Sequence, residues 1–178
     1  MSERESIEDR VASGAIRWDE AGREAAARWR SGSDEEEAEM LRELLVFGLD
    51  RNEYAISVER VREIIRMRDL TPIPRAPEWL LGVVALRGEV VEVVDLRLKL
   101  GLPVVASDRT TRVLVLHGDD DRVTGVLVDS VSEVHRVPES EILAAQGFEI
   151  AAVVEMFRRR DGFVSILDVD RALEVRRG

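Results

Sequence analysis

The sequence predicts a mainly β protein of small barrels that follows a helical N-terminal extension. From residue 44 onward, about ten short apolar segments succeed one another with turn-forming residues between them, a pattern typical of small β-barrels. Aromatic residues make up only 4% of the 178 residues, so aliphatic side chains must fill the barrels. Residues 1–42 contain few β-branched residues but many charges and alanines, and we assign them to the extension.

The extension carries two candidate helices. Asp19 is suited to cap a helix over residues 20–30. Four residues of this region recur at helical spacing and bring two tryptophans near one face: Trp18, Ala21, Ala25 and Trp29. This face predicts docking, either onto the protein's own barrels or onto another protein. Residues 34–44, DEEEAEMLREL, have helix-forming composition with acidic residues at the start, and the alternative is a solvated lead-in to the first strand.

Four hairpins supply most of the predicted strands. The paired segments are 44–49 with 53–57, 83–86 with 90–94, 112–117 with 123–128, and 150–157 with 163–167. In each pair, runs of apolar residues lie on either side of turn-forming residues. At the second turn, Gly88 provides the positive φ that a tight connection needs. Residues 64–68 and 131–137 complete the strands, the latter because apolar and polar residues alternate along it.

Short helices and loops join these strands. The predicted helical segments are 58–63, 77–79, 96–100 and 169–175. Ser57 and Asp168 are suited to cap the first and the last of them, because their side-chain oxygens accept hydrogen bonds from the free N–H groups of a first turn. The prolines within residues 71–77 force an irregular loop. Residues 101–109 are predicted to form a surface loop.

The composition narrows the range of partners. Asp and Glu number 36 against 26 Lys and Arg, which gives a formal net charge of −10. We expect no binding to nucleic acid or to an anionic membrane, because both require a net basic face. The absence of cysteine excludes disulfides and thiolate metal sites. The polar start MSERESIEDR and the shortness of later apolar runs predict a cytoplasmic protein without membrane insertion.

No group of residues predicts catalysis. His117 and His135 lie at a strand end and on the polar face of a strand, outside any metal-binding or triad-like pattern. The aspartate run 119–121 lacks the distributed oxygen ligands of a calcium loop, and we interpret it as a solvated turn. Asp168 and Asp170 suit a helix cap better than an acid–base pair. We therefore predict no catalytic residue, cofactor or metal site, and an enzyme that uses Asp168 or His135 is the remaining alternative.

Arg87 lies at the turn of the second hairpin, between two apolar strands. From the turn alone it is either a solvated charge or a preorganised contact residue. Three longer blocks carry more information, namely FGLDRNEYAISVERVREIIR (47–66), TPIPRAPEWLLGVVALRGEVVEVVDLR (71–97) and VTGVLVDSVSEVHRVPES (123–140). Together they resemble the CheW family of chemotaxis coupling proteins, and we assign residues 43–178 to a CheW-like domain. The family has asparagine where this chain has Ala85, two residues before Arg87.

The resemblance implies a fold of two intertwined five-stranded SH3-like β-barrels with short helices. It also implies a non-catalytic cytoplasmic adaptor, recruited to receptor arrays at the inner face of the membrane. Such an adaptor binds the cytoplasmic tip of methyl-accepting chemoreceptors and the regulatory domain of a CheA-type histidine kinase. The alternative is a CheW-like scaffold outside chemotaxis that recruits a regulator through its N-terminal helix.

The resemblance further implies seven protein-binding residues. They are Val61, Glu63 and Arg87 near a receptor-facing groove, Gly82 and Gly88 around the arginine-bearing turn, and Gly125 and Val134 on the other barrel. An ion pair between Glu63 and Arg87 is expected to hold the geometry of the groove. Val61 and Val134 are expected to offer apolar contact to a receptor helix bundle. The alternatives are a solvated ion pair and plain core packing.

Overall fold

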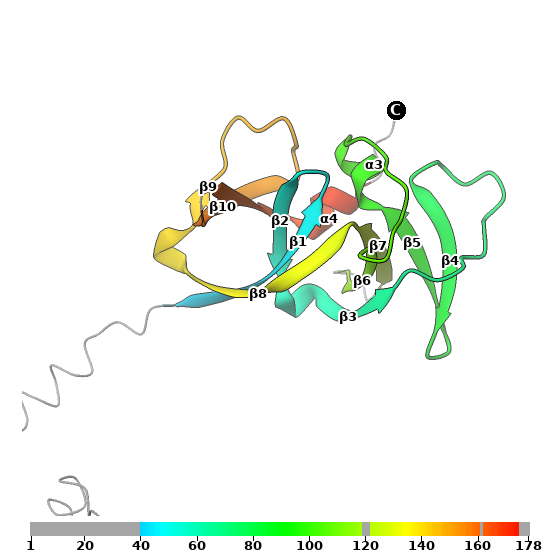
Figure 1. Ribbon diagram of the computed structural model, residues 1–178. Helices are drawn as coiled ribbons and strands as arrows, with labels where there is room; N and C mark the ends of the chain where they lie inside the picture. The colour runs from blue at the N-terminus through cyan, green and yellow to red at the C-terminus, as the bar shows by residue number, and fades with distance from the viewer. Residues whose placement is uncertain (1–39, 119–121, 161, 175–178) are drawn as a thin grey trace, which may run out of the picture. The chain divides into compact units, whose positions relative to one another are not determined.

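The computed structural model describes residues 40–118, 122–160 and 162–174 of the chain (Figure 1). The chain divides after Glu39 into two units, and every described residue belongs to the second. Trp18, Trp29 and the aspartate run 119–121 therefore lie outside the described residues, and their roles stay predictions. Among the described residues, no helix is long and apolar enough to cross a membrane.

Strands dominate the described part of the chain. In chain order they are β1 Leu41–Leu49, β2 Asn52–Ser57, β3 Val61–Arg66, β4 Leu80–Leu86, β5 Glu89–Asp95, β6 Arg112–His117, β7 Val123–Val128, β8 Ser130–Pro138, β9 Leu143–Ala144, β10 Val153–Arg159 and β11 Gly162–Leu167. The helices are α3 Leu96–Leu100 and α4 Val169–Leu173, and the 3-10 turns are η1 Val58–Arg60 and η2 Glu139–Glu141. The four predicted hairpins and the helices after β5 and β11 are confirmed.

The strands form two mixed sheets, which curl into two small barrels (Figure 1). Barrel A has the strand order β8-β1-β2-β11-β10-β9, and barrel B has the order β3-β6-β7-β5-β4. In barrel B the segment after β3 bridges to β4, where Thr71 and Val83 exchange two N–H to O hydrogen bonds of 2.9 Å. The predicted small barrels are confirmed. The two-residue strand β9 adds a sixth strand to barrel A.

The barrels are intertwined because the chain repeats one unit and exchanges strands between the two copies. The N-terminal half (residues 41–100) contains β1 to β5 and α3, and the C-terminal half (residues 112–173) repeats this order with β6, β7, β8, β10, β11 and α4. The third strand of each half pairs with the first strand of the other, as β8 with β1 and β3 with β6. The fifth strand pairs in parallel with the other half's second strand, as β11 with β2 and β5 with β7.

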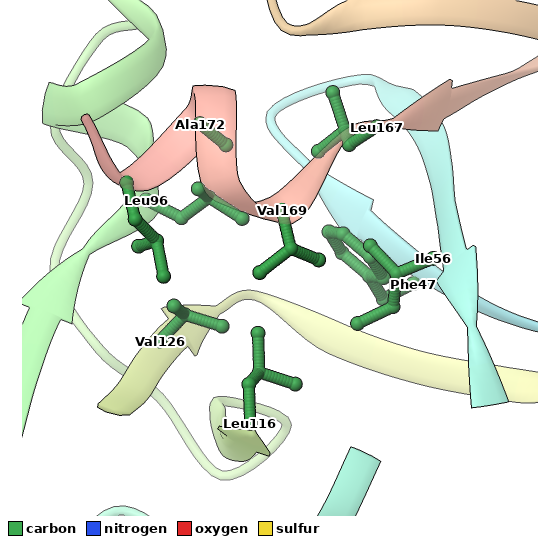
Figure 2. Close-up of a pocket in the computed structure, with 9 residues that line it drawn as sticks. Phe47, Ile56, Leu96, Leu116, Val126, Leu167, Val169 and Ala172 are labelled. Atoms are coloured by element: carbon green, nitrogen blue, oxygen red, sulfur yellow. The ribbon is translucent and has the colours of Figure 1, made fainter. Parts of the chain in front are cut away.

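Three apolar clusters fill the part of the chain that the structure describes. One lies inside barrel B and includes Val84, Val91 and Val113, and another lies inside barrel A and includes Phe157 and Val164. The largest is the inter-barrel cluster, to which both sheets and both helices contribute. Figure 2 shows its centre, where residues from α3, α4 and strands of both barrels surround an apolar cavity of about 10 Å³. This layer joins the barrels into one packed body.

Two predicted helices are wrong where strand pairing overrides local propensity. Residues 41–43, which one of the two interpretations of 34–44 placed in a helix, belong to β1, because they pair with β8. The helix predicted over residues 58–63 stops after η1, since Val61 already pairs with Leu116 of β6. The strand predicted from residue 150 begins only at Val153.

Candidate functional site

The β4–β5 turn projects Arg87 into solvent. Leu86 pairs with Glu89 across a two-residue connection, and both connecting residues have positive φ, 50° at Arg87 and 86° at Gly88. Positive φ at both positions gives the tight turn whose twist matches that of a hairpin. The sequence predicted this conformation for Gly88 but not for Arg87. The Arg87 side chain is 75% exposed, so most of its donors face solvent.

A bulge in β3 directs two neighbouring side chains toward this hairpin tip. The pairing of β3 with β6 shifts between Val61 and Glu63, which makes Arg62 the extra residue. Arg62 forms an ion pair with Glu89, and Glu63 Oε2 lies 3.5 Å from Arg87 Nη2. The expected contact between Glu63 and Arg87 is therefore present. Because it is long and exposed, it contributes at most about 1 kcal/mol to stability.

The corresponding tip of barrel A is held by a more buried arginine. Arg160 has a positive φ of 53°, as Arg87 has in barrel B. Beside it, the Arg159 side chain is only 5% exposed and donates to Glu53 at 2.6 and 2.7 Å and to Glu133 at 2.7 Å. These hydrogen bonds lower the pKa of Glu133 and raise the pKa of Arg159. Glu133 follows the bulge of β8 as Glu63 follows the bulge of β3.

An apolar strip follows the margin of the inter-barrel layer, on the edge strand of each sheet. It consists of four aliphatic residues from β3 and β8: Val61, Ile64, Val131 and Val134. Ile64 pairs with Leu114 and Val134 pairs with Leu45, and both partners belong to the inter-barrel cluster. Paired residues share a sheet face, so Ile64 and Val134 lie on the inter-barrel face. They are nevertheless 42% and 52% exposed, which leaves the layer open along this strip.

A charged surface concavity of about 620 Å³ begins beside the apolar strip. Its lining is Leu41, Arg42, Glu43, Ser57, Val58, Glu59 and Arg136. Arg136 pairs with Glu43 at 2.7 Å and Arg42 pairs with Glu155 at 2.7 Å. Arg136 lies two residues from Val134 along β8. Positively and negatively charged side chains therefore lie beside the apolar strip.

A second exposed patch lies on barrel A. Phe148 and Phe163 are 47% and 57% exposed, and both line an open concavity of about 280 Å³ together with Glu53 and Glu149. Phe163 is the second residue of β11, and Val90, the second residue of β5, is 72% exposed on barrel B. Each hairpin tip therefore presents one large apolar side chain. We call Phe148 and Phe163 the aromatic patch.

The described residues gather no reactive groups. They contain no cluster of His, Asp and Glu that could hold a metal ion. His135 stacks on Phe157 with ring centroids 5.7 Å apart, and Asp168 accepts a hydrogen bond from the Arg171 N–H as the cap of α4. Asp170 is paired with Arg60. Each of these side chains therefore has a partner within the described part of the chain.

Gly82 and Gly125, which the resemblance marked as binding residues, lie where neighbouring chain segments pack closely. Gly82 has a φ of 146°, and a Cβ there would lie 2.5 Å from the Thr71 carbonyl oxygen, at the bridge that joins β4 to the segment after β3. A Cβ at Gly125 would lie 2.8 Å from Val113 Cγ1 inside barrel B. The expectation that Gly125 and Val134 share the other barrel is wrong for Gly125, because β7 is exchanged into barrel B.

Comparisons with known proteins identify the family. The family model of the CheW-like domain matches residues 43–177. The chain belongs to the CheW-like domain family. Chemotaxis protein CheW of Helicobacter pylori is 33% identical over 112 residues, covering 63% of this chain and 67% of that protein. Chemotaxis protein CheW of Bacillus subtilis is 32% identical over 135 residues, covering 74% and 86%.

A solved structure supports the fold of this CheW-like domain. The scaffolding protein TtCheW from Thermoanaerobacter tengcongensis superposes with a TM-score of 0.71, at 24% sequence identity, over 79% of this chain and 93% of that one. At this level of identity the likeness shows the fold alone. It agrees with the two barrels described above.

Several residues of the CheW-like site were missed from the sequence. Ile64, Val131, Arg159 and Phe163 were not singled out, because each looks like an ordinary strand residue. The signal that identifies Ile64 and Val131 is the internal repeat, in which VREIIR at 61–66 matches VSEVHR at 131–136. Aligning the halves would have shown that Val61 and Glu63 have counterparts in the second half.

Proposed function

We propose that the protein is a non-catalytic adaptor that couples chemoreceptors to a CheA-type histidine kinase. The observation that carries the proposal is the apolar strip, because an aliphatic margin between two packed barrels suits the apolar face of an amphipathic helix. Membership of the CheW-like domain family and similarity to proteins named chemotaxis protein CheW support it.

The cytoplasmic tip of a methyl-accepting chemoreceptor is the proposed occupant of the apolar strip. Its helix would bury Ile64 and Val134, which are the most exposed members of the strip. Arg87 would extend this site, because its exposed guanidinium forms charge-assisted hydrogen bonds with an acidic side chain of the partner. Glu63 would then keep Arg87 near the tip through their 3.5 Å contact.

The kinase regulatory domain is the proposed partner of the aromatic patch. Phe148 and Phe163 provide large apolar area, and aromatic side chains are typical centres of protein interfaces. The patch lies on barrel A at β11 and the loop before β10, whereas the strip lies on β3 and β8. Separate surfaces allow one adaptor molecule to hold the receptor and the kinase at the same time in the cytoplasm, at the receptor array.

Binding measurements with two variants test this assignment. We expect Val134→Asp to weaken binding of a receptor signalling domain at least tenfold while kinase binding stays unchanged, because it places a charge in the strip. We expect Phe163→Asp to do the reverse. Val104→Asp is the matched control, since Val104 is 60% exposed but lies in the loop after α3. Receptor binding that survives Val134→Asp, or failure of the wild type with both partners from its own genome, would refute the proposal.

Deletion of residues 1–39, which leaves all of β1 in place, distinguishes the alternative scaffold. The adaptor proposal expects both binding activities to remain after the deletion. Intact kinase coupling combined with loss of a third protein from the complex would favour a scaffold that recruits a regulator through its N-terminal segment.

A further inference from the structure

An arginine lies beyond the aliphatic residues of the apolar strip on each edge strand. Arg66 follows Ile64 by two residues in β3, and Arg136 follows Val134 by two residues in β8. Residues two apart in a strand share a face of the sheet. Both arginines therefore extend the face on which the strip lies.

The two arginines lie at opposite ends of the strip. Val61 and Val131, the inner residues of the strip, pack against the inter-barrel cluster. From there β3 runs toward β4 in barrel B, whereas β8 runs toward β9 in barrel A (Figure 1). The strip therefore has a barrel B end at Arg66 and a barrel A end at Arg136.

The cross-strand partners of these arginines differ in charge. Arg136 lies opposite Glu43 of β1, and the two side chains form an ion pair of 2.7 Å. Arg66 lies opposite Arg112 of β6. The two pairs are counterparts in the repeat, because β1 matches β6 and β3 matches β8 in the same pairing register. Where barrel A has a glutamate, barrel B has a second arginine.

The charge of the arginine pair, Arg66 with Arg112, is left uncompensated. Arg66 is exposed, and no acidic side chain in the described part of the chain forms an ion pair with either arginine. Arg112 Nη1 donates at 2.8 Å to the backbone carbonyl oxygens of Arg109 and Thr111, which hold the guanidinium without neutralising it. Like charges directly opposite on neighbouring strands destabilise a sheet. Barrel B therefore keeps a repulsion at the position where barrel A has an attraction.

The barrel A end of the strip presents charges of both signs. Beside the pair of Glu43 with Arg136, the charged concavity includes Glu59 and Arg42, and Arg42 pairs with Glu155. A partner that lies along the strip thus meets two uncompensated positive charges at the barrel B end and a mixed surface at the barrel A end.

We propose that the arginine pair receives the acidic end of the amphipathic helix that the strip binds. The helix places its aliphatic face on the strip and its acidic side chains against the two guanidiniums, which form charge-assisted hydrogen bonds with carboxylates. The pair thereby fixes the direction in which the helix lies, because the reverse direction leaves both arginines uncompensated. The inference rests on the proposed function in taking a receptor helix as this occupant.

Reversing one charge of the arginine pair tests its role in affinity. Arg66→Glu places a glutamate opposite Arg112, as Glu43 lies opposite Arg136 in barrel A. We expect its denaturation midpoint to be no lower than that of the wild type. Binding of a receptor signalling domain should weaken about tenfold at low salt, and the loss should shrink as added salt screens the contact. Arg51→Glu, in the exposed β1–β2 turn, makes the same change in net charge and is expected to leave binding unchanged.

Peptides test the direction of the helix without the receptor. Two synthetic amphipathic helices of about 18 residues carry the same leucine face, with glutamates in the first turn of one and in the last turn of the other. A nitroxide beside the glutamates broadens the NMR signals of nearby methyl groups. We expect stronger broadening at Ile64 than at Val134 with both peptides, and the Arg66→Glu variant should lose this difference.

The outcomes separate this inference from the proposed function. If Val134→Asp abolishes receptor binding while Arg66→Glu and Arg51→Glu bind equally well, the adaptor stands and the role of the arginine pair is overturned. If the wild type does not bind the receptor domain, the proposed function fails and the peptides decide the inference alone. Equal or reversed broadening, absence of peptide binding, or a lowered midpoint of Arg66→Glu overturns it.

Discussion

Glu133 and Glu63 occupy corresponding places in the two barrels but differ in what they contact. Glu133 accepts a 2.7 Å hydrogen bond from Arg159, whose side chain is 5% exposed and also binds Glu53. Glu63 Oε2 lies 3.5 Å from Arg87 Nη2, and the Arg87 side chain is 75% exposed. The barrel A tip is therefore fixed by charge-assisted hydrogen bonds. The barrel B tip keeps its arginine available to a partner.

The Glu133 contact predicts a pH dependence of stability. Hydrogen bonding to Arg159 lowers the pKa of Glu133 from its ordinary value of 4.5, so the folded state binds fewer protons than the unfolded state in that range. The stabilising effect of Glu133 is therefore complete above pH 4.5 and is lost as the pH falls through the lowered pKa. We expect Glu133→Gln to unfold more easily than wild type at neutral pH and to approach it in acid. Urea unfolding across the acid range measures this, and a constant difference would contradict it.

Gly82 gives a second prediction at the level of a single residue. An alanine Cβ there would lie 2.5 Å from the Thr71 carbonyl oxygen, a backbone atom that shifts only with the strand bridge. The φ of 146° adds strain for any residue other than glycine. We expect Gly82→Ala to lower the free energy of unfolding by about 2–4 kcal/mol. Gly88→Ala is the control, because nothing lies within 4 Å of its added Cβ, and a similar loss there would show that strain alone is responsible.

At the level of elements, the sequence predicted structures that depend on neighbouring residues. It did not predict which distant strands pair. The hairpin of β4 and β5, the cap at Asp168 and helix α3 follow from residues adjacent in the chain. The parallel pairings of β5 with β7 and of β2 with β11 join distant segments, which periodicity does not detect. Antiparallel pairing with the distant strand β6 likewise places Val61 in β3, although its spacing from Val58 favoured a helix.

The two helix caps differ in burial, and this difference predicts their relative importance. Asp95 accepts hydrogen bonds from the N–H groups of Arg97 and Leu98, at 2.8 and 3.4 Å, and is 6% exposed. Asp168 caps α4 with one bond of 3.1 Å to Arg171 and a side chain 36% exposed. We expect Asp95→Ala to cost about 2 kcal/mol and Asp168→Ala about 1 kcal/mol or less in unfolding free energy. Thermal unfolding of both variants checks the order, and a larger loss at Asp168 would contradict it.

For the whole molecule, the sequence anticipated the barrels but only part of the site. Composition and strand spacing predicted barrels filled with aliphatic residues, and the resemblance supplied their number and their intertwining. The apolar strip depends on which face of β3 and β8 meets the inter-barrel layer, and that follows from pairing partners such as Leu114 and Leu45. Val134 was predicted because the resemblance marked it. Ile64 becomes visible as its counterpart only when the two halves of the sequence are aligned.

The inter-barrel cluster predicts that the two barrels unfold together. Phe47 of barrel A is completely buried in this layer, near Leu116 and Val126 of barrel B (Figure 2). Removing its ring by Phe47→Ala should cost about 3–5 kcal/mol, because the void is shared by both barrels. We expect one cooperative transition with faster amide exchange in strands of both barrels. Val84→Ala, inside barrel B, should shift the same single transition by a smaller amount. Two separate transitions, or exchange in β6 and β7 that Phe47→Ala leaves unchanged, would show that the barrels are independent folding units.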